Sequence, residues 1–539
     1  MNAPLAELIF AAARRRPDAP AIRDGGDTVA YADLADAVRD TARALVGLGL
    51  GRGDRVAVFL EKRREAVVAM FAAAAAGAAF VPINPLLKPR QVAHILADCG
   101  ARVLVTSPER LRALENVPAA TESLRWILRT DRVTATAGAA AGAAPPGPSI
   151  LDWHDLPGAG EAVAAVHRVV ETDMAAILYT SGSTGPAKGV VLSHRNLVAG
   201  AESVVSYLDN RPDDRLLCVL PFSFDYGLSQ LTTAFAVGAC AVLLNYLLPR
   251  DVIAAVAREG ITGLACVPPL WIQLAELDWP EEARRHLRYL TNSGGALPRP
   301  TLAALRARLP ETRVYLMYGL TEAFRSTYLP PDEVDRRPDS IGKAIPNAEV
   351  LVVREDGALC APGEPGELVH RGPLVAKGYW NDPTRTAERF RPLPGAVADH
   401  GLAETAVWSG DTVRADEDGY LYFVGRRDEM IKSSGYRISP TEVEEVIYAS
   451  GLVGEAVVIG LSHPVLGQAV VAVATPPATG ALDEDALLAA CRRDLPSFMT
   501  PRAVVARADL PRNANGKIDR RRLADELADL LLPETGAAR

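Results

Sequence analysis

Short apolar runs, each the length of one buried strand, alternate with helical patterns through the first 320 residues of this 539-residue chain. The runs occupy residues 56–59, 103–106, 176–179, 216–220, 241–244, 264–267 and 314–317. Such alternation is typical of α/β folds, because a crossover helix returns the chain to a parallel neighbouring strand. We therefore expect an α/β fold with largely parallel sheets in this region.

The pattern changes after about residue 345. Strand-like runs at 350–353, 367–370 and 420–424 are separated by Gly/Pro turns, which predicts a small β-rich subdomain. The last hundred or so residues return to an α/β pattern, with helical segments at 438–449 and 483–491 and strand-like runs at 456–460 and 469–474. Residues 134–149 are of low complexity and predict a flexible surface loop.

Composition and charge argue against several classes of protein. The chain has 58 Lys and Arg against 66 Asp and Glu, a formal charge of −8, which disfavours a general nucleic-acid binder. Its six scattered cysteines favour free thiols in a reducing cytoplasm over disulfides or a zinc site. Residues 66–83 are apolar and long enough to span a bilayer, but they include Gly77 and Pro82, so we predict a buried helix leading into a strand. Without a signal peptide or an integral membrane segment, we expect a cytoplasmic protein.

Lysine is scarce, with seven residues against 51 arginines. A GC-rich genome explains the scarcity, but Arg cannot replace Lys where chemistry needs a compact, movable ammonium. Three of the seven, Lys188, Lys432 and Lys517, lie in the segments 180–190, 428–440 and 511–520, which carry the motifs described next.

Residues 177–190 read ILYTSGSTGPAKGV, a strand that enters a loop rich in glycine and hydroxyl side chains. The glycines let backbone N–H groups approach an anion closely, and the hydroxyls and one ammonium add donors. The loop is not a Walker A motif, because Ala187 and Gly189 stand where that motif needs Gly and Ser or Thr. The segment predicts a polyphosphate site.

This segment resembles the signature of the adenylate-forming superfamily, which includes acyl-CoA synthetases, the adenylation domains of peptide synthetases and firefly-type luciferases. Ala187 replaces the usual proline. Four more segments match the family in order: 293–298 (SGGALP), 318–322 (YGLTE), 409–411 (SGD) and 425–440, and a fifth, 511–518 (PRNANGKI), follows. Each has an ordinary structural explanation alone, but together they span about residues 30 to 525.

The resemblance implies roles for the site residues. Those expected to bind the nucleotide are Thr180, Ser181, Gly182, Ser183, Thr184, Gly185, Lys188, Gly295, Ala296, Tyr318, Gly319, Thr321, Glu322, Asp411, Arg426 and Lys517. Among these, Tyr318 would stack on adenine, Thr321 would meet the α-phosphate and Asp411 would hold the ribose hydroxyls. Glu322 would hold Mg²⁺, a hard cation that prefers carboxylate oxygen beside phosphate. The expected catalytic residues are Lys517, Lys188, Thr184, Glu322 and Lys432.

The resemblance also implies the architecture and the reaction. Residues 1–426 would form the adenylation domain, 427–432 a hinge that pivots at Asp428, and 433–539 a smaller mobile α+β domain. ATP and the acid would give an acyl-adenylate and pyrophosphate, and a thiol would then displace AMP, with Lys432 and Gly435 on the thiol-binding face. The cofactors would be ATP, Mg²⁺ and CoA, or the phosphopantetheine of a carrier protein. We expect a monomer or homodimer.

The acyl pocket is expected to contain Phe224, Asp225, Ser229, Gly294, Met317 and Arg325. Asp225 occupies a place where amino-acid-activating domains carry an aspartate that pairs with the substrate ammonium. The acid would then be polar, with an amine, a second carboxylate or both. Alternatively, Asp225 and Arg325 pair with each other and leave an apolar pocket, since unpaired buried charges are costly.

The leading hypothesis is an AMP-forming acid–thiol ligase that transfers a carboxylic acid to CoA. One alternative is an amino-acid-activating ligase that loads a separate carrier protein, and another is a nucleotide-binding homologue without catalysis. The wider sequence also resembles a bacterial acyl-CoA ligase subgroup associated with exosortase and exopolysaccharide gene sets.

Overall fold

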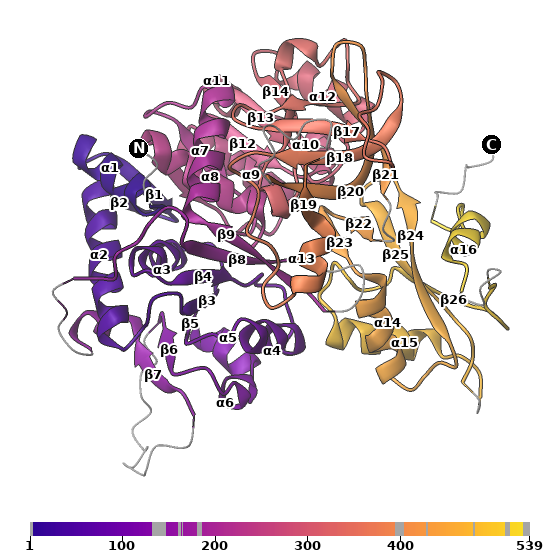
Figure 1. Cartoon of the computed structure of the whole chain (residues 1–539), viewed down its shortest axis with the longest axis horizontal. Coiled ribbons are helices and arrows are strands. Elements are labelled where there is room, and N and C mark those ends of the chain that lie inside the picture. The colour runs from indigo at the N-terminus through magenta and orange to yellow at the C-terminus, as the bar shows by residue number, and fades with distance from the viewer. Residues whose placement is uncertain are drawn as a thin grey trace.

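Three β-sheets with helices packed around them make up the chain (Figure 1). The computed structural model describes residues 4–131, 147–159, 163, 165–180, 186–393, 404–426, 430–477, 480–512 and 518–531. The low-complexity loop expected at 134–149 lies mostly outside these residues, and Ser149 already begins a strand.

The first sheet has seven strands and is parallel except at one edge. Its order is β7 (Ser149–Asp152), β6 (Trp126–Arg129), β5 (Val103–Thr106), β3 (Arg55–Phe59), β4 (Ala79–Pro82), β8 (Met174–Thr180) and β9 (Lys188–Ser193). Strand β9 runs antiparallel to β8, with Thr180 opposite Lys188. The two strands therefore hold both ends of the predicted phosphate loop at one edge of the sheet.

The second sheet joins the parallel region to the β-rich region. Its order is β17 (Glu349–Val353), β18 (Pro365–Arg371), β20 (Thr405–Ala415), β21 (Leu421–Arg426), β16 (Ser340–Ala344), β15 (Thr327–Leu329), β14 (Arg313–Tyr318), β13 (Tyr289–Asn292), β12 (Gly263–Cys266), β10 (Arg215–Cys218), β11 (Cys240–Leu243), β1 (Pro20–Asp24) and β2 (Asp27–Ala30), with β19 (Phe390–Pro392) beside β20. The strands from β14 to β1 are parallel, whereas those from β15 to β17 are antiparallel. The predicted β-rich subdomain thus continues the large sheet through β16.

Two helices between these sheets are buried on nearly all sides. In α3 (Arg64–Ala75) and α8 (Asp225–Val237), unbroken runs of ten and eleven residues are buried. A helix that is apolar all round belongs in a core. Residues 66–83 accordingly form α3 and β4, as predicted, and no helix in the described part of the chain is long and apolar enough to span a membrane.

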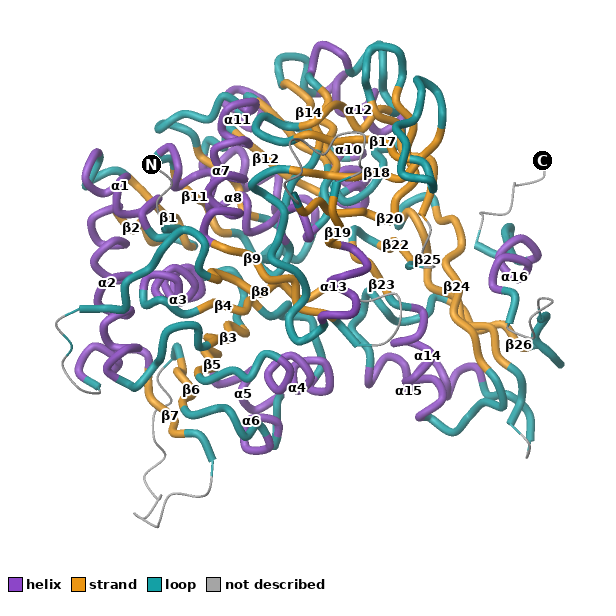
Figure 2. The backbone as a smooth tube through the Cα atoms, in the orientation of Figure 1, coloured by secondary structure: helices purple, strands orange, loops and turns teal. Residues whose placement is uncertain are grey.

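The remaining helices of this region pack around the first two sheets and against α3 and α8 (Figure 2). They are α1 (Glu7–Arg15), α2 (Tyr31–Gly47), α4 (Pro89–Asp98), α5 (Pro108–Ala113), α6 (Val117–Ala120), α7 (His194–Leu208), α9 (Pro249–Glu259), α10 (Pro268–Glu276), α11 (Glu281–His286), α12 (Arg299–Arg308) and α13 (Pro383–Arg389). The seven strands predicted from the apolar runs are all present, so the α/β fold is confirmed.

The C-terminal part has its own sheet and core, and lies to one side in Figure 1. The sheet contains β23 (Tyr436–Ile438), β22 (Ile431–Ser433), β25 (Gly467–Ala474), β24 (Ala456–His463) and, beside β25, β26 (Ala503–Ala506). Its helices are α14 (Pro440–Ala449), α15 (Glu484–Asp494) and α16 (Arg520–Glu526).

Polar contacts join this part to the rest of the chain at α4. Arg90 on α4 forms a salt bridge of 2.9 Å with Glu445 on α14, and the Asn84 amide lies 3.5 Å from the Tyr436 hydroxyl. These contacts close one side of the cavity described below.

Candidate active site

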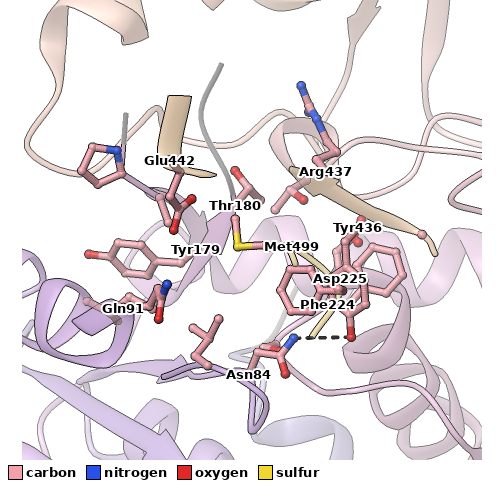
Figure 3. A pocket seen from close by; sticks show the side chains of 18 of the residues that line it. Asn84, Gln91, Tyr179, Thr180, Phe224, Asp225, Tyr436, Arg437, Glu442 and Met499 are labelled. Atoms are coloured by element: carbon pink, nitrogen blue, oxygen red, sulfur yellow. Dashed lines mark hydrogen bonds between the residues drawn. The ribbon is translucent and has the colours of Figure 1, made fainter. Parts of the chain in front are cut away.

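A cavity of about 340 Å³, called the outer cavity here, lies where the C-terminal part meets the two large sheets (Figure 3). Side chains from both parts of the chain surround it. Figure 3 shows Thr180, Phe224 and Asp225 from the larger part of the chain together with Tyr436, Arg437 and Met499 from the C-terminal part. Of the residues predicted for the site, it is lined by Thr180, Phe224, Asp225, Gly294, Gly319, Thr321, Arg325 and Lys432.

A buried cluster of Lys188, Tyr379 and Glu322 lies next to Thr321, which lines the outer cavity. The Lys188 ammonium donates to the Tyr379 hydroxyl over 2.7 Å, and that hydroxyl donates to Glu322 Oε1 over 2.7 Å. Lys188 Nζ also lies 3.6 Å from the same carboxylate oxygen. The first residue of β9 and the short 3₁₀ helix Thr321–Ala323 therefore bring together two residues that the motifs single out, 134 positions apart, and Tyr379 bridges them.

Burial and charge shift the pKa values of this cluster. Burial lowers the pKa of Lys188 to about 8 even though the Glu322 carboxylate opposes the change. Burial by itself would raise the pKa of Glu322, but the Lys188 ammonium, Arg437 and the Tyr379 hydroxyl together lower it to about 2. Glu322 is therefore an anion at neutral pH, and Lys188 is close to its titration point.

One carboxylate oxygen of Glu322 is available to bind the predicted cation. Its Oε2 is buried and has no hydrogen-bond partner within the described residues. An ionised buried carboxylate needs a donor or a cation, and Mg²⁺ in phosphate sites is commonly held by one or two carboxylates together with phosphate oxygens. Glu322 therefore has the chemistry to hold Mg²⁺ when a polyphosphate is bound.

Tyr318 and Asp411 contact each other beside the cavity. Tyr318 ends β14, Asp411 lies in β20, and the Tyr318 hydroxyl donates to Asp411 Oδ2 over 2.5 Å. Ser409 supports this part of β20, because its hydroxyl donates to Leu368 O and accepts from the Asp411 N–H. The residues predicted for adenine and ribose thus form one hydrogen-bonded unit.

Asp225 and Arg325, both predicted for the acyl pocket, form a buried pair in the lining of the outer cavity. Arg325 Nη1 lies 3.5 Å from Asp225 Oδ2, and both side chains are at most 5% exposed. Burial raises the pKa of Asp225, and the Arg325 guanidinium only partly offsets it. Of the two arrangements expected from the sequence, the structure has the mutual pair.

The remaining acyl-pocket residues divide between two places. Ser229 and Met317 line a separate inner cavity of about 30 Å³, and Arg325 lines both this inner cavity and the outer one. Met317 Sδ also accepts a hydrogen bond of 3.2 Å from Tyr207. The predicted pocket is therefore interrupted by the Arg325 side chain.

A strained turn at Phe324 aims Glu322 and Arg325 in different directions. Phe324 has φ of 56° and ψ of −46°, a conformation costly for a residue with a side chain. Its buried ring packs against Gly200 on α7, where an added Cβ would lie 2.6 Å from Phe324 Cδ1. A glycine at 200 therefore makes room for the ring that fixes this turn.

A third cavity, called the side cavity, opens between the large sheets and the C-terminal part. Its lining includes Gly294, Gly295, Ala296, Lys432, Gly435, Arg520 and Arg521. Gly435 has φ of +82°, and a Cβ there would lie 2.9 Å from Val267 Cγ1. Since Gly294, Lys432 and Gly435 line both cavities, they stand between the side cavity and the outer cavity. Gly295 and Ala296, expected at the nucleotide, lie on the side cavity.

Some predicted site residues lie outside the described part of the chain. They are Ser181, Gly182, Ser183, Thr184, Gly185, Asp428, Lys517 and the side chain of Arg426.

Sequence reasoning missed two polar contributors. Tyr379 belongs to the run Lys377-Gly378-Tyr379-Trp380, where a glycine beside two aromatic residues was the available signal. Arg437 lies within the 425–440 segment, but no role was expected for it.

Comparison with known proteins identifies the family. The family model for AMP-binding enzymes matches residues 9–380, and that for the AMP-binding enzyme C-terminal domain matches residues 442–517. A long-chain-fatty-acid–CoA ligase of Salmonella typhimurium is 32% identical, with 97% of this chain and 94% of that protein covered. A feruloyl-CoA synthase of Amycolatopsis is 33% identical, with 94% and 95% covered.

Among solved structures, o-succinylbenzoate CoA synthetase of Bacillus subtilis, bound with a product analogue, matches with a TM-score of 0.81 and 26% identity. The match covers 97% of this chain and 98% of that one. Both domain models, the relatives matched over nearly their whole length and the shared fold agree with one another, and the chain therefore belongs to the AMP-binding enzyme family as an AMP-forming acyl-CoA ligase.

Proposed function

We propose that the outer cavity is where this ligase joins a carboxylic acid to AMP, with Lys188 and Glu322 at the phosphates. The single observation that carries the proposal is the Lys188–Tyr379–Glu322 cluster, in which an ammonium and a carboxylate are held within 3.6 Å. Attack by a carboxylate on the α-phosphate brings two anions together, so fixed cations lower the barrier. Mg²⁺ would supply further positive charge, and Glu322 Oε2 is the atom that would hold it.

The nucleoside would be held by Tyr318 and Asp411. A carboxylate accepts hydrogen bonds from both hydroxyls of a ribose diol, and Asp411 is supported for this by Tyr318 and Ser409. Thr180 and Thr321 line the outer cavity and offer hydroxyl donors nearer the phosphates. Lys517 would bridge the acid and the phosphate, the role that suits a flexible ammonium.

The thiol would enter through the side cavity. Gly294 and Gly435 line both this cavity and the outer cavity, and a Cβ built on Gly294 would lie 3.8 Å from Gly435 Cα. Because the two backbones are this close, they would have to separate for a thin chain such as the pantetheine arm of CoA to pass between them, and as glycines they present no side chains in its way. Arg520 and Arg521 also line this cavity, and guanidinium groups suit the phosphates of CoA.

Each half-reaction would need its own lysine. We propose that Lys517 serves acyl-adenylate formation and Lys432 serves thiol transfer, with a rotation at the 427–432 hinge between them. The 1–426 and 433–539 parts meet at the outer cavity through polar contacts such as Arg90–Glu445, which a rotation breaks at little cost.

Half-reaction assays test these roles. Lys517→Ala should lower acid-dependent ATP–pyrophosphate exchange strongly, while thioester formation from a synthetic acyl-adenylate stays near wild type. Lys432→Ala should have the opposite profile. Equal losses in both assays for both variants would contradict the division of labour.

A second candidate is an amino-acid-activating ligase that loads a separate carrier protein. Asp225 favours it, because its carboxylate lines the outer cavity where a substrate ammonium would sit. The test measures thioester formation with CoA as the acceptor and, separately, with a panel of phosphopantetheine-bearing carriers. Turnover with carriers alone would select this candidate over CoA transfer.

A further inference from the structure

Arg325 separates two cavities at the acyl end of the site. It lines the outer cavity on one side and the inner cavity on the other, and its side chain is 2% exposed. Its guanidinium carbon lies 4.8 Å from the centre of the Tyr226 ring, a cation–π contact that helps to fix its position between the two cavities. Any acyl group that extends from the phosphates towards the inner cavity meets this guanidinium first.

The guanidinium has unused donor capacity. Nη1 donates to Phe324 O over 3.1 Å and lies at the limit of hydrogen bonding, 3.5 Å, from Asp225. Nη2 is buried and meets no acceptor anywhere in the described ranges. A buried charged donor without a partner is costly, typically by several times the net gain of an ordinary hydrogen bond.

The inner cavity has a mainly apolar lining, with side chains such as Leu208, Leu264 and Met317, but two more polar atoms in its lining have no partner within the described part of the chain. Gln230 Oε1 and Thr233 Oγ1 are both buried without a hydrogen-bond partner among the residues that the structure describes, and both residues line this cavity. Ser229 adds a third polar side chain to the same wall. These polar atoms suit a water molecule or an oxygen-bearing group placed directly beside them.

The inner cavity is also small. Its volume of about 30 Å³ holds about two or three water molecules, since each needs roughly 10–15 Å³ measured in this way. An alkyl chain long enough to pass Arg325 would have to displace the guanidinium and break its contact with Asp225. The geometry therefore limits the length of the acyl group.

We propose that the acid is short and carries a second oxygen acceptor at its far end, which receives the free Nη2 donor of Arg325. This inference rests on the proposed function, because it places the reacting carboxylate at the phosphates. The acceptor is a second carboxylate, an amide or a keto oxygen; all three satisfy the donor. An ammonium alone does not, because it competes for Asp225 and leaves Nη2 without a partner. Arg325 is thus a specificity-determining residue.

An acid panel of matched length tests the proposal. The rate of AMP release with CoA is compared for a dicarboxylate, its mono-amide, a keto acid, an amino acid and a plain monocarboxylate, each with four to six carbons. We expect kcat/KM for at least one acceptor-bearing acid to exceed that for the monocarboxylate about tenfold or more, the value of one hydrogen bond to a charged group. A preference for the amino acid without a second acceptor, or for the plain monocarboxylate, would overturn the proposal.

Two variants separate the donor from the barrier. Arg325→Met removes the donors but keeps bulk in the opening, so the preference for the acceptor should disappear without a gain for longer acids. Arg325→Ala joins the two cavities, so monocarboxylates of eight or more carbons should gain relative to short ones. Unchanged selectivity in both variants would refute the role of Arg325.

A matched control and a binding measurement separate folding from selectivity. Arg288→Met breaks a partly buried pair, in which Arg288 Nη2 lies 2.7 Å from the buried Asp214 carboxylate, and it should lower thermal stability without altering acid preference. ATP-dependent thermal shifts show whether each variant still binds nucleotide. If wild type gives no acid-dependent AMP with any acid, the proposed function fails; if it turns over but ignores the acceptor, only this inference fails.

Discussion

Removing one hydroxyl, in Tyr379→Phe, tests whether the cluster around Glu322 works as a unit. The hydroxyl accepts from the Lys188 ammonium and donates to the Glu322 carboxylate, each over 2.7 Å. The phenyl ring would remain, and with it the contact of 4.0 Å between the Lys188 ammonium and the ring centre. The variant therefore removes two hydrogen bonds to charged groups and little packing.

The expected loss follows from these contacts. A hydrogen bond to a charged group contributes about 1.5–3 kcal/mol. Lys188 and Glu322 stay within 3.6 Å of each other and keep part of their attraction, so we expect a net loss nearer 2 kcal/mol than the sum of both bonds. That corresponds to a fall of roughly tenfold to a hundredfold in kcat/KM.

Acid-dependent ATP–pyrophosphate exchange measures this loss directly, with Mg²⁺ varied at fixed ATP. The apparent affinity for Mg²⁺ should weaken as well, because the variant removes the hydrogen bond that fixes the orientation of the Glu322 carboxylate. Tyr31→Phe is the matched control, since the Tyr31 hydroxyl donates over 2.6 Å to Ala239 O within the buried core. The control should lose stability but keep exchange. An exchange rate for Tyr379→Phe within twofold of wild type would show that the Tyr379 hydroxyl is not needed to hold Lys188 and Glu322 in their working positions.

Three further changes test other parts of the site. Asp411→Asn should raise the KM for ATP about tenfold in the exchange assay, since an amide replaces an ionised acceptor of the ribose hydroxyls; an unchanged KM would exclude that role. Gly200→Ala places a methyl 2.6 Å from the Phe324 ring, so both thermal stability and exchange should fall, and full activity would show that the turn relaxes freely. Burial, assisted by Glu445, raises the pKa of Glu442 from 4.5 to about 7, so the folded chain binds this proton more tightly than the unfolded chain. The stability that this group contributes is therefore present below pH 4.5 and is lost as the pH rises through 7. Glu442→Gln should flatten this part of the plot of melting temperature against pH. An unaltered plot would contradict the raised pKa of Glu442.

Much of the fold could be predicted because its signals are local. Apolar runs such as 103–106 and 314–317 mark buried parallel strands, and α3 is recognisable from an apolar stretch too long for a strand. The junction of the β-rich region with the large sheet was not predictable, because the pairing of β16 with β21 joins residues about eighty positions apart. Strand order depends on which edges meet in three dimensions, and periodicity does not record that.

Lys188, Glu322 and Asp411 could be proposed as site residues from the sequence, because each belongs to a single local motif. The site was not predictable where side chains from distant segments meet. Tyr379 reaches Lys188 across 191 positions, and Arg325 meets Asp225 across 100. The sequence left open whether that last pair would form, because the choice depends on burial and orientation.

The central claim is that this chain converts an acid, ATP and CoA to a thioester, AMP and pyrophosphate. The most direct measurement incubates the purified full chain with Mg²⁺, ATP, CoA and the acid panel, and quantifies AMP and acyl-CoA in the same sample. Equal amounts of the two products are expected, formed only when acid and CoA are both present and lost in Lys188→Ala. ADP in place of AMP, or AMP without any thioester across the panel, would contradict this claim.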